Sequence, residues 1–207
     1  MYIPKYYKNE DPDAVRSFID RNGFAVLVSQ VSGRLWATHI PLMLDRTGDG
    51  KDILFGHISR ANSQWKDFDR NQEVLAIFSG PDAYVSSSWY DHENVPTWNY
   101  LAVHIYGKIH IIEGDNLKNQ MRKLVDKYES GMQHPVSIDR MTSDYVDQEL
   151  RGIIGFEIEV TDIQAATKLS QNRDKINFDR VIKGLENQGD MKSLEIARIM
   201  KKLSDHE

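Results

Sequence analysis

Apolar and polar residues alternate in short runs along most of the chain, a pattern typical of half-buried β-strands. Glycine, proline, aspartate and asparagine bound most of these runs and predict turns between them. We expect strands at residues 24–31, 35–44, 53–58, 73–79, 83–86, 100–112 and 153–160. Gly80-Pro81-Asp82 predicts a turn between two of them, and Gly107 inside the long run is typical of a bulge or a sharp barrel bend.

Other segments have the periodicity of helices. Asp11 is a candidate N-cap for a short first helix, which Gly23 is placed to end. Between residues 116 and 130, apolar residues recur at the spacing of an amphipathic helix. The C-terminal part of the chain predicts two further helices, at 179–186 and 193–203. The helices therefore flank the strands and interrupt them only once.

This order of elements predicts an α+β fold in one domain that spans residues 1–207. Its centre is an antiparallel barrel or sheet of about six strands, because turn signals separate most of the successive short strands. Flanking helices cover it, and residues 175–207 form a C-terminal helical extension. We find no repeat and no low-complexity linker that would mark a second domain.

Composition narrows the class of protein. Hydrophobic residues make up 40% of the 207 and charged residues 28%, which is globular composition. The chain has no cysteine, so disulfides and thiolate metal sites are excluded. No apolar run approaches the roughly 20 residues of a membrane-spanning helix, and the N-terminus resembles no secretory signal. We expect a cytoplasmic protein without a membrane partner.

The formal net charge of -5 weighs against autonomous nucleic-acid binding, because phosphate contacts need a basic excess. The C-terminal helical pair is still a candidate helix-turn-helix, with Gly189 in its short connection. Lys192, Arg198, Lys201 and Lys202 make its last helix basic. Acidic neighbours dilute that charge, and a hairpin packed on the barrel explains the pattern equally well. DNA stays a possible partner that the charge does not support.

Polar and aromatic residues interrupt the strands in clusters at 37–42, 56–66, 80–90 and 95–100. In the second cluster, Ser59, Arg60 and Asn62 stand where a strand ends and a helical turn begins. Hydroxyl, guanidinium and amide donors beside free backbone N–H groups suit a phosphate monoester. A capped turn with an exposed arginine explains the same spacing. Both interpretations stay open on the residues alone.

Aromatic residues are concentrated between Trp65 and Tyr106, where they either wall a flat ligand or fill a core and an interface. Beside phosphate donors they indicate a nucleotide-like cofactor, although the dinucleotide fingerprint G-x-G-x-x-G is absent. The histidines do not follow a compact metal-ligand spacing, so buried, hydrogen-bonded histidines are the favoured interpretation. Residues 86–88 are three serines without the elbow of a hydrolase nucleophile.

Six motifs in one order resemble a known family, the FMN-binding negative transcriptional regulators of the PaiB type. They are Met1–Tyr7 with Asp11-Pro12, residues 37–42, residues 56–66, residues 84–90, residues 95–100 with Val103-His104, and residues 168–173. The chain departs from the family pattern at Ser59, Ser63, Asp82 and Ser87. The resemblance runs nearly end to end.

This resemblance implies an FMN-binding split β-barrel that forms a homodimer, with FMN in a groove at the dimer interface. It implies that the segments around Thr38 and Arg60 hold the isoalloxazine edge and the phosphate. The cofactor-binding candidates are Thr38, His39, Gly56, His57, Ser59, Arg60, Asn62, Asn99, Lys168 and Gln171. Arg60 and Ser59 would bind the phosphate, and Thr38 and His57 would contact the flavin or its ribityl chain. Alternatives are a flavin-dependent oxidoreductase and a haem-binding split barrel with a histidine ligand.

Overall fold

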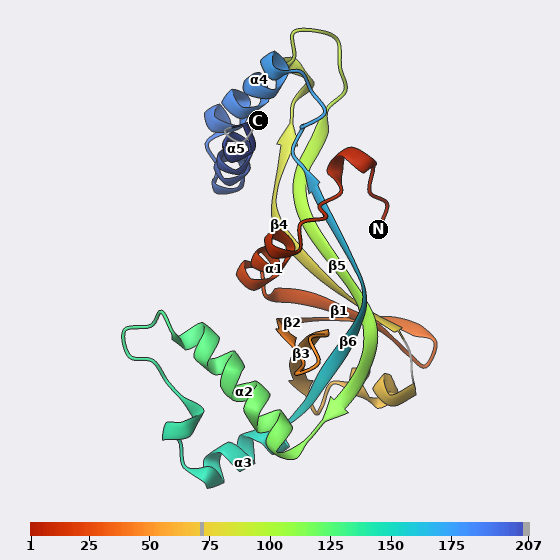
Figure 1. The fold of residues 1–207 in the computed structure, drawn as a ribbon, viewed down its shortest axis with the longest axis vertical. Coiled ribbons are helices and arrows are strands. Elements are labelled where there is room, and N and C mark those ends of the chain that lie inside the picture. Colours follow the sequence, from red (N-terminus) through yellow and green to blue (C-terminus); the bar gives the residue numbers. More distant parts are fainter. Residues whose placement is uncertain (71–72, 205–207) are drawn as a thin grey trace. The chain divides into compact units, whose positions relative to one another are not determined.

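A computed structural model describes residues 1–70 and 73–204 (Figure 1). Its strands are β1 (Phe24–Val31), β2 (Arg34–Arg46), β3 (Asp52–Ser59), β4 (Glu73–Val85), β5 (Thr97–Ile112) and β6 (Ile153–Lys168). They close into a barrel in the order β1-β2-β3-β6-β5-β4. β1 pairs antiparallel with β2 and β4, and β3 pairs antiparallel with β2 and β6.

The α-helices are α1 (Pro12–Arg21), α2 (Gly114–Glu129), α3 (Ser143–Arg151), α4 (Lys175–Gln188) and α5 (Met191–Ser204). The short 3-10 helices of the described residues are η1 (Lys5–Tyr7), η2 (Ser63–Arg70), η3 (Ser87–Trp89) and η4 (Ile138–Arg140). The Asp11 carboxylate caps α1 by accepting from the backbone N–H groups of Asp13 and Ala14. The expected first helix and its cap are therefore confirmed.

Contacts group the described residues into two compact units. Unit 1 contains residues 1–18, 79–103 and those from 164 onward, and unit 2 contains residues 19–78 and 104–163, apart from 71 and 72. Strands β4, β5 and β6 contribute residues to both units.

Unit 2 contains a core in which β3 is buried on both faces. Leu54 and Phe55 are adjacent and point to opposite sides of the strand, yet neither is exposed to solvent. Phe55 packs under the helical segment that follows β5, against Leu117 and Met121 of α2. The T-shaped pair of Phe68 and Phe156, with ring centroids 5.5 Å apart, lies in the same unit.

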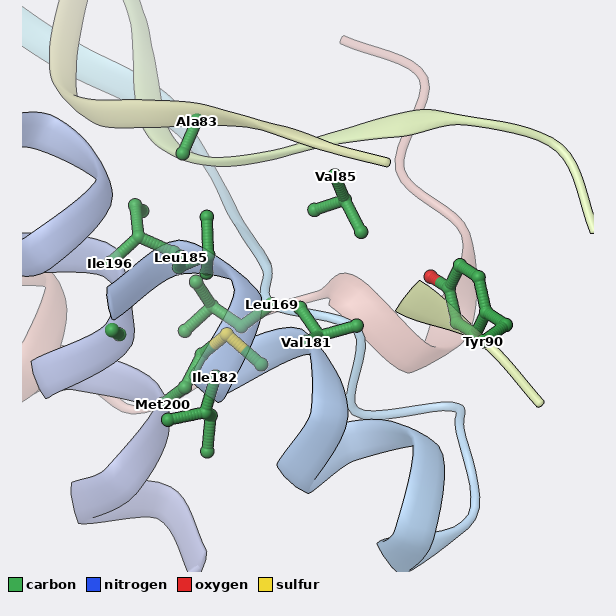
Figure 2. Close-up of a cluster of buried hydrophobic side chains, with 10 residues drawn as sticks. Ala83, Val85, Tyr90, Leu169, Val181, Ile182, Leu185, Ile196 and Met200 are labelled. Atoms are coloured by element: carbon green, nitrogen blue, oxygen red, sulfur yellow. The ribbon is translucent and has the colours of Figure 1, made fainter. Parts of the chain in front are cut away.

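Unit 1 has its own core, which joins the C-terminal helices to the end of β4 (Figure 2). Its buried members are Ala83, Val85, Tyr90, Leu169, Val181, Ile182, Leu185, Ile196, Ala197 and Met200. Gly189 has a φ of 75° and allows the tight connection between α4 and α5. The helical pair is thus an integral layer of this core, as the hairpin interpretation of the sequence requires.

Two expectations from the pattern are wrong, and one helix was missed. β4 runs through Gly80-Pro81-Asp82 without a turn, and a Cβ at Gly80 would lie 2.6 Å from the Phe18 ring, so this glycine permits close packing. β6 extends to Lys168 rather than ending near Val160. Helix α3 was missed because Val146 is its one buried residue, and a single buried position gives no apolar periodicity in the sequence.

Candidate functional site

The polar centre of unit 2 is the side chain of Gln64, which is wholly buried. Its Nε2 donates to the backbone oxygen of Leu27 at 3.2 Å and to Ser29 Oγ at 3.0 Å. Its Oε1 accepts a hydrogen bond of 2.5 Å from Thr38 Oγ1. Gln64 therefore connects β1, β2 and the first turn of η2 through a fully satisfied buried amide.

Thr38 and Asn62, both candidates from the sequence, meet in this network. Asn62 Nδ2 donates to Thr38 Oγ1 at 2.9 Å, and Asn62 Oδ1 accepts from the backbone N–H of Gln64 at 3.0 Å. Sequence reasoning missed Gln64, although it lies inside the 56–66 motif. The signal for it in the sequence was a polar residue directly before Trp65, two positions after Asn62.

Arg60 is anchored where α3 ends and β6 begins. Its Nε donates to the backbone oxygen of Arg151 at 2.7 Å, and Nη2 donates to that of Ile153 at 3.0 Å. The Arg60 carbonyl accepts from Trp65 Nε1 at 2.9 Å. Among the described residues, Nη1 of Arg60 has no hydrogen-bond partner. The guanidinium is thus held in place with one donor group left over.

Beside Arg60 lies a pocket of about 420 Å³ within unit 2. Its lining mixes both signs of charge and consists of Arg60, Glu113, Gly114, Asp115, Leu117, Lys118, Asp147, Leu150 and Arg151. Three of these side chains are cationic and three are carboxylates. The pocket therefore has no excess positive charge of its own, and any anion there depends on directed donors such as Arg60.

The histidine candidates differ in their surroundings. His57 lies in β3 opposite Gly155 of β6, and its Nδ1 is buried without a hydrogen-bond partner. Burial lowers the pKa of His57, so the ring is neutral near pH 7. His39 is exposed and stacks on Phe24, with ring centroids 6.2 Å apart. The expectation of buried, hydrogen-bonded histidines is wrong for His39, which is exposed, and for Nδ1 of His57 and of His104, which is buried without a hydrogen-bond partner.

Gly56 is required by packing. A Cβ at this position would lie 2.7 Å from Leu42 Cδ2 and 3.0 Å from the backbone oxygen of Pro41. Those atoms belong to the neighbouring strand β2, which pairs with β3 here. A contact between Gly56 and a cofactor stays a prediction.

The remaining candidates lie in unit 1. Asn99 is wholly buried, accepts from Ser170 Oγ at 3.0 Å and donates to Met200 Sδ at 3.5 Å. Lys168 donates to Thr97 Oγ1. Gln171 donates from Nε2 to the backbone oxygen of Tyr6 at 3.0 Å. These side chains tie the turn after β6 to neighbouring segments of the same unit.

The candidates thus form two groups. Thr38, His39, Gly56, His57, Ser59, Arg60 and Asn62 lie in unit 2, whereas Asn99, Lys168 and Gln171 lie in unit 1. Ser59 stands directly before Arg60, and its Oγ accepts from the backbone N–H of Ala61 at 3.3 Å.

Within the part of the chain that the structure describes, no group of three or more His, Asp or Glu side chains is placed to hold a metal ion. None of the helices formed by residues 1–70 and 73–204 is long and apolar enough to cross a membrane.

A closed six-stranded barrel with flanking helices defines an α+β protein of the split-barrel class. Solved structures with this fold include the flavocytochrome Anf3 from Azotobacter vinelandii, with a TM-score of 0.59 and 17% identity. That match covers 81% of this chain and 72% of the other. The FAD and haem binding protein from Mycobacterium smegmatis has a TM-score of 0.62 at 15% identity, covering 78% and 73%. At these identities the likeness shows the fold, and the predicted split barrel is confirmed.

The chain belongs to the family described as "Putative FMN-binding domain", whose model matches residues 1–162. It is 42% identical over 200 residues to "Protease synthase and sporulation protein PAI 2" of Bacillus subtilis, covering 97% of this chain and 96% of that one. It is also 28% identical over 246 residues to an uncharacterized protein of Emericella nidulans, covering 97% and 96%. The resemblance to the PaiB-type family, drawn from the motifs, is confirmed.

Proposed function

We propose that this protein binds FMN as a homodimer and acts as a negative transcriptional regulator of the PaiB type. The observation that carries the cofactor assignment is the anchored guanidinium of Arg60. Two backbone carbonyls hold it, and Nη1 is left to donate to a ligand. A phosphate oxygen is a suitable acceptor, because charge-assisted hydrogen bonds from a pre-positioned arginine are strong.

The other residues of unit 2 fit a phosphorylated flavin. Ser59 and Arg60 supply the phosphate donors, and the hydroxyl of Thr38 is positioned by Gln64 and Asn62. His57 Nδ1, buried and without a partner, is available to the flavin or its ribityl chain. Bound FMN would supply electron-transfer chemistry, while these side chains bind and orient it. Asn99, Lys168 and Gln171 each bond within unit 1, and their contacts to FMN stay a prediction.

Titration of FMN and of riboflavin, which lacks the phosphate, tests the assignment. We expect Arg60→Ala to weaken FMN binding about tenfold or more and to leave riboflavin binding nearly unchanged. Arg46→Ala is the matched control, since Arg46 is an exposed arginine of unit 2 paired with Asp52 at 3.1 Å. Absence of FMN binding to the wild-type protein would overturn the proposal. A Soret band retained through gel filtration would then favour the haem alternative.

Exposed apolar side chains of β1 and β2 support the homodimer. Phe24 is 68% exposed and Leu35 is 70% exposed, and the pairing of β1 with β2 places both on the same face of one hairpin of unit 2. Exposed groups of this kind mark interaction surfaces, and we assign this one to a second copy of the chain. Sedimentation of wild type and Leu35→Glu tests it, and a wild-type monomer would contradict it.

The net charge of the protein and the packing of α4 and α5 favour a regulator that does not bind DNA by itself. The net charge is -5, and α4 and α5 bury their apolar faces in the core of unit 1. A gel shift at low salt with the DNA upstream of the protein's own gene tests this, and tight binding would contradict it.

Mixing the FMN-loaded protein with NADH or NADPH tests the oxidoreductase alternative, which predicts reduction of the flavin.

A further inference from the structure

Two cationic side chains of unit 1 lie on tyrosine rings at the turn between β6 and α4. Lys168 Nζ is 5.9 Å from the centroid of the Tyr7 ring, and Arg173 Cζ is 5.1 Å from that of Tyr90. Among the described residues, neither cation has a carboxylate partner. Lys168 donates to the hydroxyl of Thr97, which fixes the position of its ammonium group.

The carboxylates that follow in this part of unit 1 are engaged elsewhere. Asp174 caps α4 by accepting from the backbone N–H and the side chain of Asn177, at 3.0 and 2.8 Å. Asp91 accepts from Asn177 Nδ2 at 3.0 Å and pairs with His92 at 2.8 Å. Neither Asp91 nor Asp174 is paired with Lys168 or Arg173.

The pKa of Lys168 is consistent with a cation that has no carboxylate partner. Burial, followed by the positive charge of Arg173, lowers the pKa of Lys168. Both cations are half-buried, and an anion bound to them would offset the cost of their partial burial and their mutual repulsion. Tyr90, whose ring Arg173 covers, is only 7% exposed, and its buried hydroxyl has no hydrogen-bond partner among the described residues.

We propose that Lys168 and Arg173 form an oxyanion-binding site in unit 1, which takes the phosphate or carboxylate group of a small molecule. Thr97 positions the lysine, and the rings of Tyr7 and Tyr90 form the walls. The ammonium offers a compact charge and the guanidinium a planar pair of donors, a combination that suits a tetrahedral or planar oxyanion. This site does not depend on Arg60, so it stands whether or not Arg60 binds FMN.

Inorganic phosphate is the probe for the first experiment, carried out on the full chain without flavin. We expect saturable binding in calorimetry that falls about tenfold or more in Arg173→Met and in Lys168→Met. Lys175→Met is the matched control, since Lys175 is an exposed lysine of unit 1 paired with Asp179 at 3.3 Å, and it should bind as wild type does. Wild-type affinity in both site variants would overturn the proposal.

A second measurement keeps the test valid if a variant folds poorly. Followed by NMR of labelled lysine side chains in the wild-type protein, the pKa of Lys168 should rise when phosphate binds, because an anion stabilises the ammonium. Arg173→Lys, which keeps a positive charge, should retain part of the phosphate affinity. An unchanged Lys168 signal at saturating phosphate would contradict the site.

The source of the oxyanion is decided by repeating the titration with FMN and riboflavin. Competition between FMN and phosphate at Lys168, with none from riboflavin, would identify the phosphate of FMN as the natural group and would contradict its placement at Arg60. Phosphate binding that persists in the FMN-loaded protein would identify a separate small anion. Loss of FMN binding in Arg60→Ala with phosphate binding retained would separate the two proposals.

Discussion

The guanidinium of Arg60 is held by the backbone carbonyl of Arg151, to which its Nε donates at 2.7 Å. A second bond joins Nη2 to the carbonyl of Ile153, and the Arg60 N–H donates to the carbonyl of Gly152 at 2.9 Å. Since α3 ends at Arg151 and β6 begins at Ile153, one side chain ties the turn after β3 to this junction. A candidate ligand residue is therefore also a structural one.

Substitution of Arg60 should lower stability as well as flavin affinity. In Arg60→Ala the carbonyls of Arg151 and Ile153 lose their donors, and we expect a loss of about 1–2 kcal/mol in the free energy of unfolding. Arg60→Lys keeps the charge but cannot reproduce the two-pronged contact, so most of that loss should persist. Urea titration of both variants and of Arg46→Ala measures this. Wild-type stability in Arg60→Ala would show that these bonds contribute nothing.

The sequence predicted the first helix, the first three strands and the helical tail within a few residues, because their periodicity and end signals agree. It failed at Gly80-Pro81-Asp82, where local turn chemistry is overridden by the packing of Phe18 against Gly80. The structure brings Thr38 and Asn62, from two separate polar clusters of the sequence, into one hydrogen bond within unit 2. Hydrogen bonds to backbone carbonyls carry no sequence signal, so the anchoring of Arg60 could not be foreseen.

The buried amide of Gln64 is expected to contribute more to stability than the side chain of Arg60. Gln64→Leu has nearly the same shape but leaves the Leu27 carbonyl and the hydroxyls of Ser29 and Thr38 without this partner. We expect a loss of about 2–3 kcal/mol, the cost of buried polar groups left unsatisfied. Gln133→Leu, at an exposed position, is the control in the same urea titration. Equal effects in the two variants would contradict a role for the network.

Protonation of His57 should destabilise the protein below about pH 6.5. Burial lowers the folded-state pKa of His57, so the unfolded chain binds this proton more readily. The contribution is fully present above the unfolded pKa of about 6.5 and is lost as the pH falls toward the lower folded value. We expect His57→Asn to weaken the dependence of unfolding free energy on pH below about pH 6.5. His134→Asn, at an exposed site, should leave the wild-type slope, and the same slope in His57→Asn would contradict the argument.

Gly107 should tolerate no side chain, although it lies inside an unbroken strand. A Cβ there would lie 2.3 Å from the backbone oxygen of Glu159 and 2.6 Å from Ile158 Cγ2, both in the facing part of β6. A backbone carbonyl cannot rotate away as a side chain can, so the two strands would have to separate. We expect Gly107→Ala to cost about 3 kcal/mol or more in the free energy of unfolding. Gly48→Ala, which meets nothing within 4 Å, should change it by less than about 0.5 kcal/mol. Similar unfolding midpoints for the two variants would show that β6 can move away from Gly107, and the barrel would then be more plastic here than its packing implies.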